Sequence, residues 1–535
     1  MASVARGRAE QDDETEAVVP GAPGALPAVV EERRQRALTA ILDVTRFQLT
    51  TLVRSVSDRL TARARSVSLA TVETEVRDVM LALSHAVLTD VVRLRGTGYQ
   101  GPSYVCPCGE RLVFKEVAPL QQRTWCGTLI VDRAVYAGAG CQERAHHLPL
   151  DAAWGLLGAT APPTALPDPD GGTLVAVAPG TGPARLSPSF AALVVEFGAR
   201  LPFAEAAWLL ERTLGAVAHL APNTVGAYTK AAGRARGHQE DAHRVRTDPP
   251  SFAERRAVVD QPPVARPATA PDTLVITMDG AIERTHQGWK EVKLGAVYDL
   301  VRRVRRVGDA VTTGLRAGAV TYTATLEPAQ TFGRHLRATA QRRGVGWARQ
   351  VVVLGDGATW IWKLADRRFA RAVQIVDWFH AREHLWDLAQ LLYGEGTAAA
   401  HTWCETLTSV LWTAQTTDDV TLLATAADEA WSTPRKDLPD GVPRRTATGR
   451  RAVLKAVAYF TTNASRMRYG AFRDQDLPVG SGVIEGGCQS VLHLRLKRPG
   501  ACWNVDSAEA LVRARALICS DSVPTCPHPL DRLAS

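Results

Sequence analysis

The sequence lacks long apolar runs and is poor in cysteine. No stretch of about 18 consecutive apolar residues occurs, so we expect no transmembrane helix and no membrane partner. The N-terminal stretch also lacks the apolar core of a secretory signal. The nine cysteines, an odd number, are scattered over 535 residues, which favours a reducing compartment over a disulfide framework. We therefore expect a cytoplasmic protein.

A strong excess of one charge is also missing. The formal net charge of +8 is a mild excess over this length, and it favours a polyanionic partner only weakly. The hydrophobic content of 46% is ordinary for a globular protein. A chain of this size can bury a sizeable core in roughly two to four domains.

The N-terminal part of the chain combines helical patterns with a small β module. Residues 31–95 carry apolar residues at helical spacing, which predicts a helical core or a dimerisation element. Further on, TLIVDRAVY (128–136) predicts a strand by its β-branched content. Cysteine and histidine near this strand suit a tetrahedral zinc site, with candidate ligands Cys106, Cys108, Cys141 and His146. Their irregular spacing leaves a second interpretation open, a β-hairpin whose thiols bind no metal.

Residues 186–233 contain three short helical patterns. Two short helices joined by a turn resemble a helix-turn-helix, whose second helix enters the major groove of DNA. Lys230, Arg234 and Arg236 lie on or after this candidate recognition helix. A plain helical bundle is the alternative interpretation.

Two Asp-Gly pairs follow apolar runs in the second half of the chain. DTLVITMDG (272–280) leads into Asp279-Gly280, and QVVVLGDGATWIW (350–362) leads into Asp356-Gly357. The continuous valine, isoleucine and leucine runs predict strands buried on both faces, in an α/β core with a mixed sheet flanked by helices. Acids at the carboxyl ends of such strands point into the crevice where α/β sheets bind ligands. A hairpin turn is the other interpretation of each pair.

Glu485 is the natural third carboxylate. It follows Gly-Ser-Gly at the start of a segment, 483–497, that is expected to be helical. Converging carboxylates repel one another unless cations neutralise them, and Mg²⁺ prefers oxygen ligands and leaves positions open for phosphate. The long stretch between Asp356 and Glu485 is mostly helical in pattern, which predicts an α-helical insertion in the core.

Basic residues lie near both parts of this expected core. LVRRVRRVG (300–308) follows the second strand, and RLKR (495–498) follows Glu485. If they contact phosphates of bound DNA, the contacts come from Arg302, Arg303, Arg305, Arg306, Arg495, Lys497 and Arg498. A solvated charged face is the alternative interpretation.

Several motifs together resemble the DDE transposases of bacterial insertion sequences, in particular the ISKra group (number four in that series). In chain order over residues 270–518 they are TMDGA with GWKEVKLGAVY, VVVLGDGATWIWKL, QIVDWFHAREHLW, RMRYGAFRDQDLPVGSGVIEGG and RLKRPGACW. The resemblance implies a ribonuclease-H-like core in which Asp279, Asp356 and Glu485 are catalytic and bind two Mg²⁺ or Mn²⁺ ions. It also implies cleavage at transposon-end DNA and strand transfer into target DNA, by a homodimer or larger assembly in the bacterial nucleoid.

Two further features concern the same resemblance. Asp377 to His380 match an Asp/Cys-x-x-His signature of several transposase groups. Asp377, His380 and His384 share one helical face and are expected to support the site through hydrogen bonds, with no metal assigned to them. The family pairs its cysteines as Cys-x-x-Cys, whereas Gly138 stands where the second pair would begin, which weighs against zinc.

These patterns define the expected domain organisation and leave the function with alternatives. A ribonuclease-H-like nuclease without strand transfer and an inactive descendant that binds DNA as a regulator both stay open. The expected segments are a disordered tail (1–29), a helical region (30–97), a small β module resembling a degenerate zinc ribbon (98–157), a linker (158–185), a helix-turn-helix-like region (186–248), a linker (249–271), the first part of the core (272–365), the helical insertion (366–475), the last part of the core (476–520) and a tail (521–535).

Overall fold

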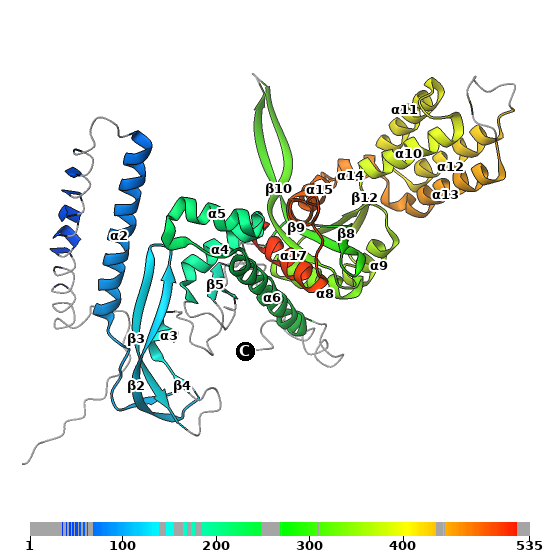
Figure 1. Cartoon of the computed structure of the whole chain (residues 1–535). Helices are drawn as coiled ribbons and strands as arrows, with labels where there is room; N and C mark the ends of the chain where they lie inside the picture. Colours follow the sequence, from blue (N-terminus) through cyan, green and yellow to red (C-terminus); the bar gives the residue numbers. More distant parts are fainter. Residues whose placement is uncertain are drawn as a thin grey trace, which may run out of the picture. The chain divides into compact units, whose positions relative to one another are not determined.

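The computed structural model describes isolated positions between residues 35 and 61, and then residues 68–106, 108–138, 146–154, 164–167, 173–176, 185–247, 268, 270–307, 310–434, 442 and 445–521 (Figure 1). The expected tails apart from residue 521, most of the linker 249–271 and Cys141 lie outside the described residues. The chain forms two compact units, residues 1–96 and 97–535.

The first unit contains helix α2 (Leu69–Arg95). Ser68 caps its N-terminus, where the hydroxyl accepts a hydrogen bond from the Thr71 amide. The helix stops at Gly96, whose φ of 71° is readily available only to glycine. The described part of residues 31–95 is therefore helical, as predicted. None of the described helices has the length and apolarity that a membrane span requires.

The second unit begins with a small β module. Its sheet has the order β1-β2-β3-β4, with a short parallel strand β7 beside β2. The strand predicted at 128–136 is confirmed as part of β3. A separate antiparallel pair, β5 and β6, lies within the expected linker 158–185. The bounds are β1 Ser103–Val105, β2 Arg111–Thr124, β3 Gly127–Ala137, β4 His146–His147, β5 Thr164–Pro167, β6 Thr173–Ala176 and β7 Arg185–Leu186, with a short helix α3 at Pro149–Trp154.

A helical group follows the β module. It comprises α4 (Pro188–Arg200), α5 (Phe203–Leu214), a 3₁₀ turn (Ala216–Ala218) and α6 (Pro222–Thr247). Along α6 the buried residues include Val225, Tyr228, Ala232, Arg236 and Glu240. Arg236, one of the candidate DNA-binding cations, donates to Glu240 inside the protein. Of the other two candidate cations, Lys230 is half-buried and Arg234 is exposed, so α6 packs one face against the protein and carries Arg234 on its other face.

The central sheet of the second unit has the strand order β10-β9-β8-β11-β12. β8 pairs antiparallel with β9, and β9 with β10, whereas β11 runs parallel to both of its neighbours, β8 and β12. The sheet is therefore mixed and has helices on both faces, in agreement with the α/β class predicted. The bounds are β8 Thr273–Thr285, β9 Gly288–Val307, β10 Ala310–Thr325, β11 Gln350–Gly355 and β12 Val373–Val376.

Alternate residues of β9 show how the two faces are covered. Leu294 packs into a cluster with residues of the C-terminal helices, among them Ile484 and Leu511. Gly295 faces the other side, where a Cβ atom would collide with Leu336 of α8. One face of the sheet is covered by α8 (Ala329–Arg342) and α9 (Thr359–Arg368). The other face is covered by α15 (Gly482–Gly487), a π-helical turn (Cys488–His493), α16 (Leu494–Leu496) and α17 (Val505–Cys519).

The expectation that β8 ends at Asp279-Gly280 is wrong. The strand continues to Thr285 and turns into β9 only after His286 and Gln287. Because Thr277 is level with Leu354 of β11, and β11 ends one residue later, Asp279 lies just beyond the point where β8 loses this neighbour. β8 keeps its pairing with β9 there, so the backbone stays extended. The alternative of a hairpin turn at this Asp-Gly pair is also wrong.

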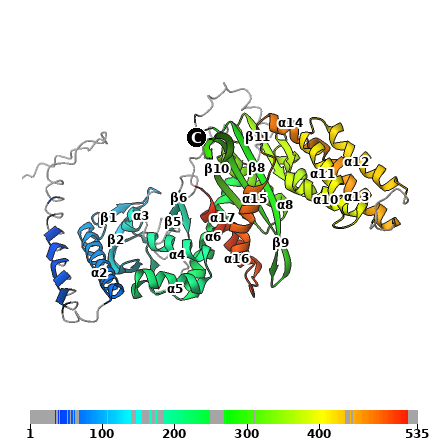
Figure 2. The ribbon, with the colours of Figure 1, turned by 90° about the horizontal axis from the view of Figure 1, so that it is seen from above.

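The expected helical insertion, 366–475, begins with a piece of the sheet. β12 pairs parallel with β11, and only the chain after it leaves the sheet as helices. The four-residue strand VQIV was too short to stand out between two helical patterns. Figure 2 shows α10–α13 gathered together. The bounds are α10 Trp378–Tyr393, α11 Ala398–Thr413, α12 Thr417–Ser432 and α13 Ala447–Asn463, followed by a 3₁₀ turn at Ala464–Arg466 and α14 at Tyr469–Asp474.

The contact between α6 and α17 gives a test of this packing. A Cβ atom on Gly233 would overlap the backbone carbonyl of Ala510, which cannot move without shifting α17. We expect Gly233→Ala to lower the free energy of unfolding by about 1–3 kcal/mol, although alanine is the better helix former. Urea denaturation measures the change. Arg234→Ala, an exposed change one residue away, should leave stability within about 0.5 kcal/mol. An equal or higher stability for Gly233→Ala would contradict this packing.

Candidate active site

Three acids stand level with one another on neighbouring parallel strands. The register pairs Leu354 of β11 with Thr277 of β8, so Asp356 and Asp279 each follow two residues later. It also pairs Gly355 with Val376 of β12, so Asp377 is level with Asp356. Neighbouring strands lie about 4.8 Å apart. The carboxyl edge of β8, β11 and β12 therefore carries a row of three aspartates.

The turn after β11 orients Asp356. One carboxylate oxygen accepts a hydrogen bond from the Ala358 amide at 2.8 Å, and Gly357 takes a φ of 102°. The backbone carbonyl of Asp356 accepts from the Tyr459 hydroxyl at 3.0 Å, and the Tyr459 ring fills the space that a Cβ on Gly357 would need. This Asp-Gly pair forms a strand-to-helix turn into α9, so the hairpin alternative is wrong here too.

Asp377 is fully buried and joins two distant segments. It caps α10, because its carboxylate accepts from the backbone amide of His380 at 2.9 Å and contacts the His380 ring nitrogen at 3.1 Å. Its other oxygen accepts from the amide of Ser481. The Trp378 amide also donates to the carbonyl of Val479. The segment that leads into Glu485 is therefore fixed to the start of α10.

Glu485 reaches the site from α15. The Ser481 hydroxyl donates to its carboxylate at 3.0 Å. One helical turn further on, the thiol of Cys488 donates to the carboxylate of Asp279 at 3.3 Å, so this helix lies against β8. The prediction that the region after residue 483 is helical is confirmed, although its middle part is a π-helical turn.

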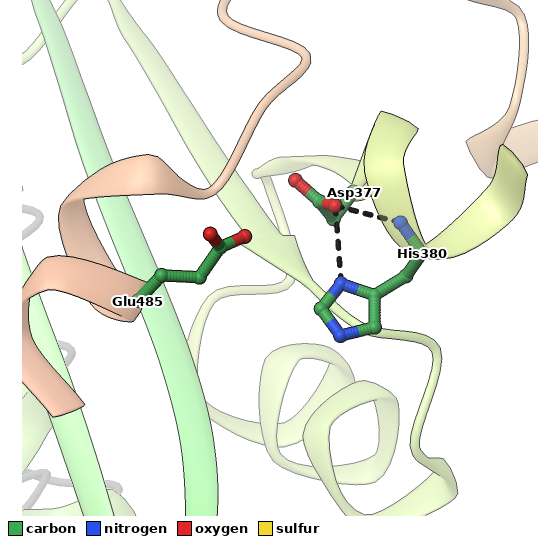
Figure 3. A group of neighbouring side chains, drawn as sticks. All are labelled: Asp377, His380 and Glu485. Carbon is green, nitrogen blue, oxygen red and sulfur yellow. Dashed lines mark hydrogen bonds and ion pairs between the residues drawn. The ribbon is translucent and has the colours of Figure 1, made fainter. Parts of the chain in front are cut away.

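Glu485 faces Asp377 and His380 (Figure 3). Among the described residues, these three form the one group of potential metal ligands whose atoms all lie within 4.8 Å of one another. Asp279 and Asp356 lie beside this group and do not belong to it. When protonated, the His380 ring offers a positive charge to both carboxylates of this group. The predicted triad is thus brought to one edge of the sheet, but its three carboxylates are not gathered as closely as the group around His380.

The donor set of this edge suits a hard divalent cation. Asp279, Asp356, Asp377 and Glu485 offer carboxylate oxygens, and Asp279 and Asp356 are half-buried while Glu485 is exposed. Oxygen ligands of this kind are those that Mg²⁺ and Mn²⁺ prefer. The residues present therefore fit the metal that the resemblance implies.

Electrostatics at the site centre on Asp377 and His380. The hydrogen bond with Asp377 raises the pKa of His380 to about 9 against the opposing effect of burial, and the charges of Asp377, Asp356 and Asp279 add to the rise. Burial raises the pKa of Asp377, but hydrogen bonds from His380 and Ser481 outweigh it and lower the pKa overall. At neutral pH the pair is an imidazolium beside a carboxylate.

His384 is placed differently from Asp377 and His380. Its ring centroid lies 4.0 Å from that of Tyr459, whose hydroxyl holds the backbone of Asp356. Burial lowers the pKa of His384, so this ring stays neutral at neutral pH. His384 therefore supports the Asp356 turn through packing.

The predicted DNA-binding cations of the second strand lie on β9. Arg302 and Arg303 are exposed, and Arg302 forms a loose ion pair of 3.7 Å with Asp476. Arg305 and Arg306 pair with Thr312 and Val311 of β10, and their side chains lie outside the described residues.

The expectation that Arg495 contacts DNA does not fit its position. Its side chain is 3% exposed and its guanidinium lies against the rings of Phe203 and Trp503. Burial, with the nearby charge of Arg515, lowers the pKa of Arg495 to about 10. An arginine enclosed by two aromatic rings fixes the helix and cannot reach a phosphate without unpacking. Lys497 and Arg498 are exposed, and Arg498 lies 3.7 Å from Glu205.

The candidate zinc ligands are only partly described. Cys106 is buried, and its sulfur lies 3.1 Å from Nε2 of His147, the neighbour of the predicted ligand His146. Cys108 is exposed. The side chain of His146 and the whole of Cys141 lie outside the described residues. A thiol and an imidazole are ligand types that zinc accepts, so His147 joins the candidate ligands.

Sequence reasoning missed three residues that shape the site. Ser481 and Cys488 lie four residues before and three residues after Glu485, and this helical spacing was a usable signal. Tyr459, which holds the Asp356 turn from α13, gave no signal, because only the fold brings it there.

The Asp377–His380 pair predicts how stability depends on pH. The pKa of His380 is raised above the ordinary 6.5, so the pair stabilises the fold fully below about pH 6.5 and is lost as pH rises through about 9. We expect the stability advantage of the metal-free protein over His380→Gln to shrink by about 1–2 kcal/mol from about pH 6 to about pH 10, after allowance for the partly exposed ring. Urea denaturation at both pH values measures it. His238→Gln, at an exposed position on α6, is the control, and an equal change in both variants would refute the assignment.

A scan against models of protein families finds no match to this chain, and a search of curated proteins finds no similar protein. The function therefore has to be inferred from the site itself. Its features are a row of aspartates at the ends of parallel strands, a glutamate on a helix far along the chain, and exposed arginines on β9.

Proposed function

We propose that this chain is a DDE-type transposase that cleaves DNA at transposon ends and joins the end to target DNA. The observation that carries the proposal is the level placement of Asp279 and Asp356 on β8 and β11, with Glu485 brought to the same edge of the sheet. Side chains at the carboxyl edge of parallel strands are where α/β sheets act on their ligands.

The fold gives further support. A mixed sheet flanked by helices suits the ribonuclease-H-like core that the resemblance implies. The helices α10–α13 stand between Asp356 and Glu485 in the chain, as expected of an insertion before the third acid. The resemblance to the ISKra group of insertion sequences rests on motifs that fall at these same elements.

Divalent ions such as Mg²⁺ or Mn²⁺, bound by Asp279, Asp356 and Glu485, would neutralise charge on a phosphate and activate the attacking hydroxyl or water. The protein's own part is positioning. The Ala358 amide orients Asp356, and the Ser481 hydroxyl orients Glu485. Such preorganised groups need little rearrangement during the reaction, which is how phosphoryl transfer is mostly accelerated.

Asp377 and His380 act as positioning residues in this proposal. Asp377 fixes both the start of α10 and the segment before Glu485. The protonated His380 provides a positive charge beside four carboxylates and thereby reduces their mutual repulsion. In the β module, Cys106 and His147 are proposed as two ligands of a structural zinc ion.

The partners follow from the chemistry. Transposition joins two transposon ends to one target, so we propose a homodimer or larger assembly on DNA, acting at the bacterial nucleoid. The exposed Lys497 and Arg498 are proposed to contact phosphates close to Glu485, since exposed cations serve this purpose.

Substitution of each acid tests the catalytic assignment. We expect Asp279→Ala, Asp356→Ala and Glu485→Ala each to reduce cleavage of DNA that flanks the gene by about a thousandfold or more, since metal-assisted stabilisation is worth several kcal/mol. DNA binding, measured by gel shift, should stay within a few-fold of the parent. Glu395→Ala changes an exposed acid after α10 and should cleave normally. Near-parent cleavage by any of the three variants would refute the assignment.

A strand-transfer assay with labelled ends separates the proposal from its two alternatives. Only a transposase produces the joined product. A nuclease would cleave without joining, and an inactive DNA-binding regulator would bind without cleaving.

A further inference from the structure

Strands β9 and β10 extend beyond the central sheet as a two-stranded arm (Figure 1). The pairing of β8 with β9 stops at Asp299, so residues 300–307 of β9 and 310–317 of β10 pair only with each other. We call these two segments the arm. An isolated two-stranded ribbon is marginally stable in water, so its exposure suggests a binding role.

The root of the arm is fixed to the sheet. The register of β9 and β10 shifts between Ala317 and Val320, at the point where the ribbon leaves β8. Such irregularities increase the local twist of a strand pair. There the Arg343 guanidinium donates to the Asp299 carboxylate and to the Ala319 carbonyl, at 2.9 Å each. These two hydrogen bonds fix the base of the arm to the helix-bearing side of the chain at Arg343.

A groove of about 1260 Å³ lies between the arm and the segment that leads to Glu485. One wall is the arm, with Arg303 and Arg316 in the lining. The other wall includes Arg473 of α14 and several residues between Asp476 and Val483. Asp476 is the one carboxylate in the lining, and it is already paired with Arg302. The groove thus has an excess of positive charge.

The groove is lined by part of the segment that leads to the candidate site. Gly480, Gly482 and Val483 line it, and Glu485 follows two residues later on α15. A Cβ atom on Gly482 would meet nothing within 4 Å, so a ligand backbone can approach closely there. A polyanion lying in the groove would therefore contact the segment that carries Glu485.

We propose that this groove binds the B-form DNA duplex next to the scissile phosphate, with the arm in the major groove and Arg303, Arg316 and Arg473 on phosphates. The major groove of B-DNA admits a two-stranded ribbon, whereas that of duplex RNA is too narrow and deep. The inference rests on the proposed function for what happens at Glu485, but its binding part stands apart from catalysis. Arg316 and Arg473 join the expected DNA-binding residues on this ground.

Binding to a labelled DNA duplex of arbitrary sequence tests the groove, because phosphate contacts require no particular sequence. The slope of log affinity against log salt concentration becomes shallower by about 0.9 for each phosphate that the protein no longer neutralises. We expect it to become shallower by about 2 in the double variant Arg303→Gln/Arg316→Gln and by about 1 in Arg473→Gln, with affinity at low salt about tenfold lower in the double variant. The matched control is Arg451→Gln/Lys455→Gln, two exposed cations on α13, which should keep the parent slope.

Each outcome decides one point. An unchanged slope in the arm and Arg473 variants, or an equal change in the α13 control, overturns the groove. An equal drop in affinity for duplex RNA overturns the choice of B-form DNA. The metal-binding acids are untouched in these variants, so Mn²⁺ binding should match the parent. If the groove variants show the shallower slope and weaker DNA binding while alanine substitutions of the acids leave cleavage intact, the groove stands and the proposed catalytic function fails.

Discussion

The buried carboxylate of Asp377 is the interaction on which the candidate site depends. It accepts hydrogen bonds from α10 and from the amide of Ser481, 104 residues further along the chain. A fully buried carboxylate needs such partners, because an unpaired charge in the interior is costly. The hydrogen bond from Ser481 therefore holds the segment before Glu485 against the end of β12. The hydrogen bond from Cys488 to Asp279 and the packing of Ile484 against Leu294 then hold the helix of the third acid against β8 and β9.

Much of the core was readable from the sequence because its signals are local. The continuous apolar runs at 273–276 and 351–354 predicted strands buried on both faces, and both lie in the sheet. The acids after them were correctly expected at one edge, because parallel strands bring their carboxyl ends together. The same reasoning misplaced the end of β8, because β8 pairs with β9 as far as Thr285, whereas its pairing with β11 ends at Thr277.

The rest depended on contacts between distant parts of the chain. Arg495 was expected on DNA because it follows Glu485 in a basic run, yet Phe203 and Trp503 enclose it. The four residues of β12 carry too little pattern to be recognised, although they place Asp377 level with Asp356. Arg316 and Arg473 share one groove although they lie on different elements far apart in the chain. No spacing within the sequence could reveal these relations.

The central claim is that the acids at the edge of β8 and β11, together with Glu485, hold divalent metal. Anomalous scattering from crystals soaked in Mn²⁺ tests this most directly. The account predicts manganese bound by Asp279 and Asp356, with the carboxylate of Glu485 turned toward it and away from His380. It would be contradicted by the absence of manganese at these aspartates, or by manganese held only by Asp377, His380 and Glu485.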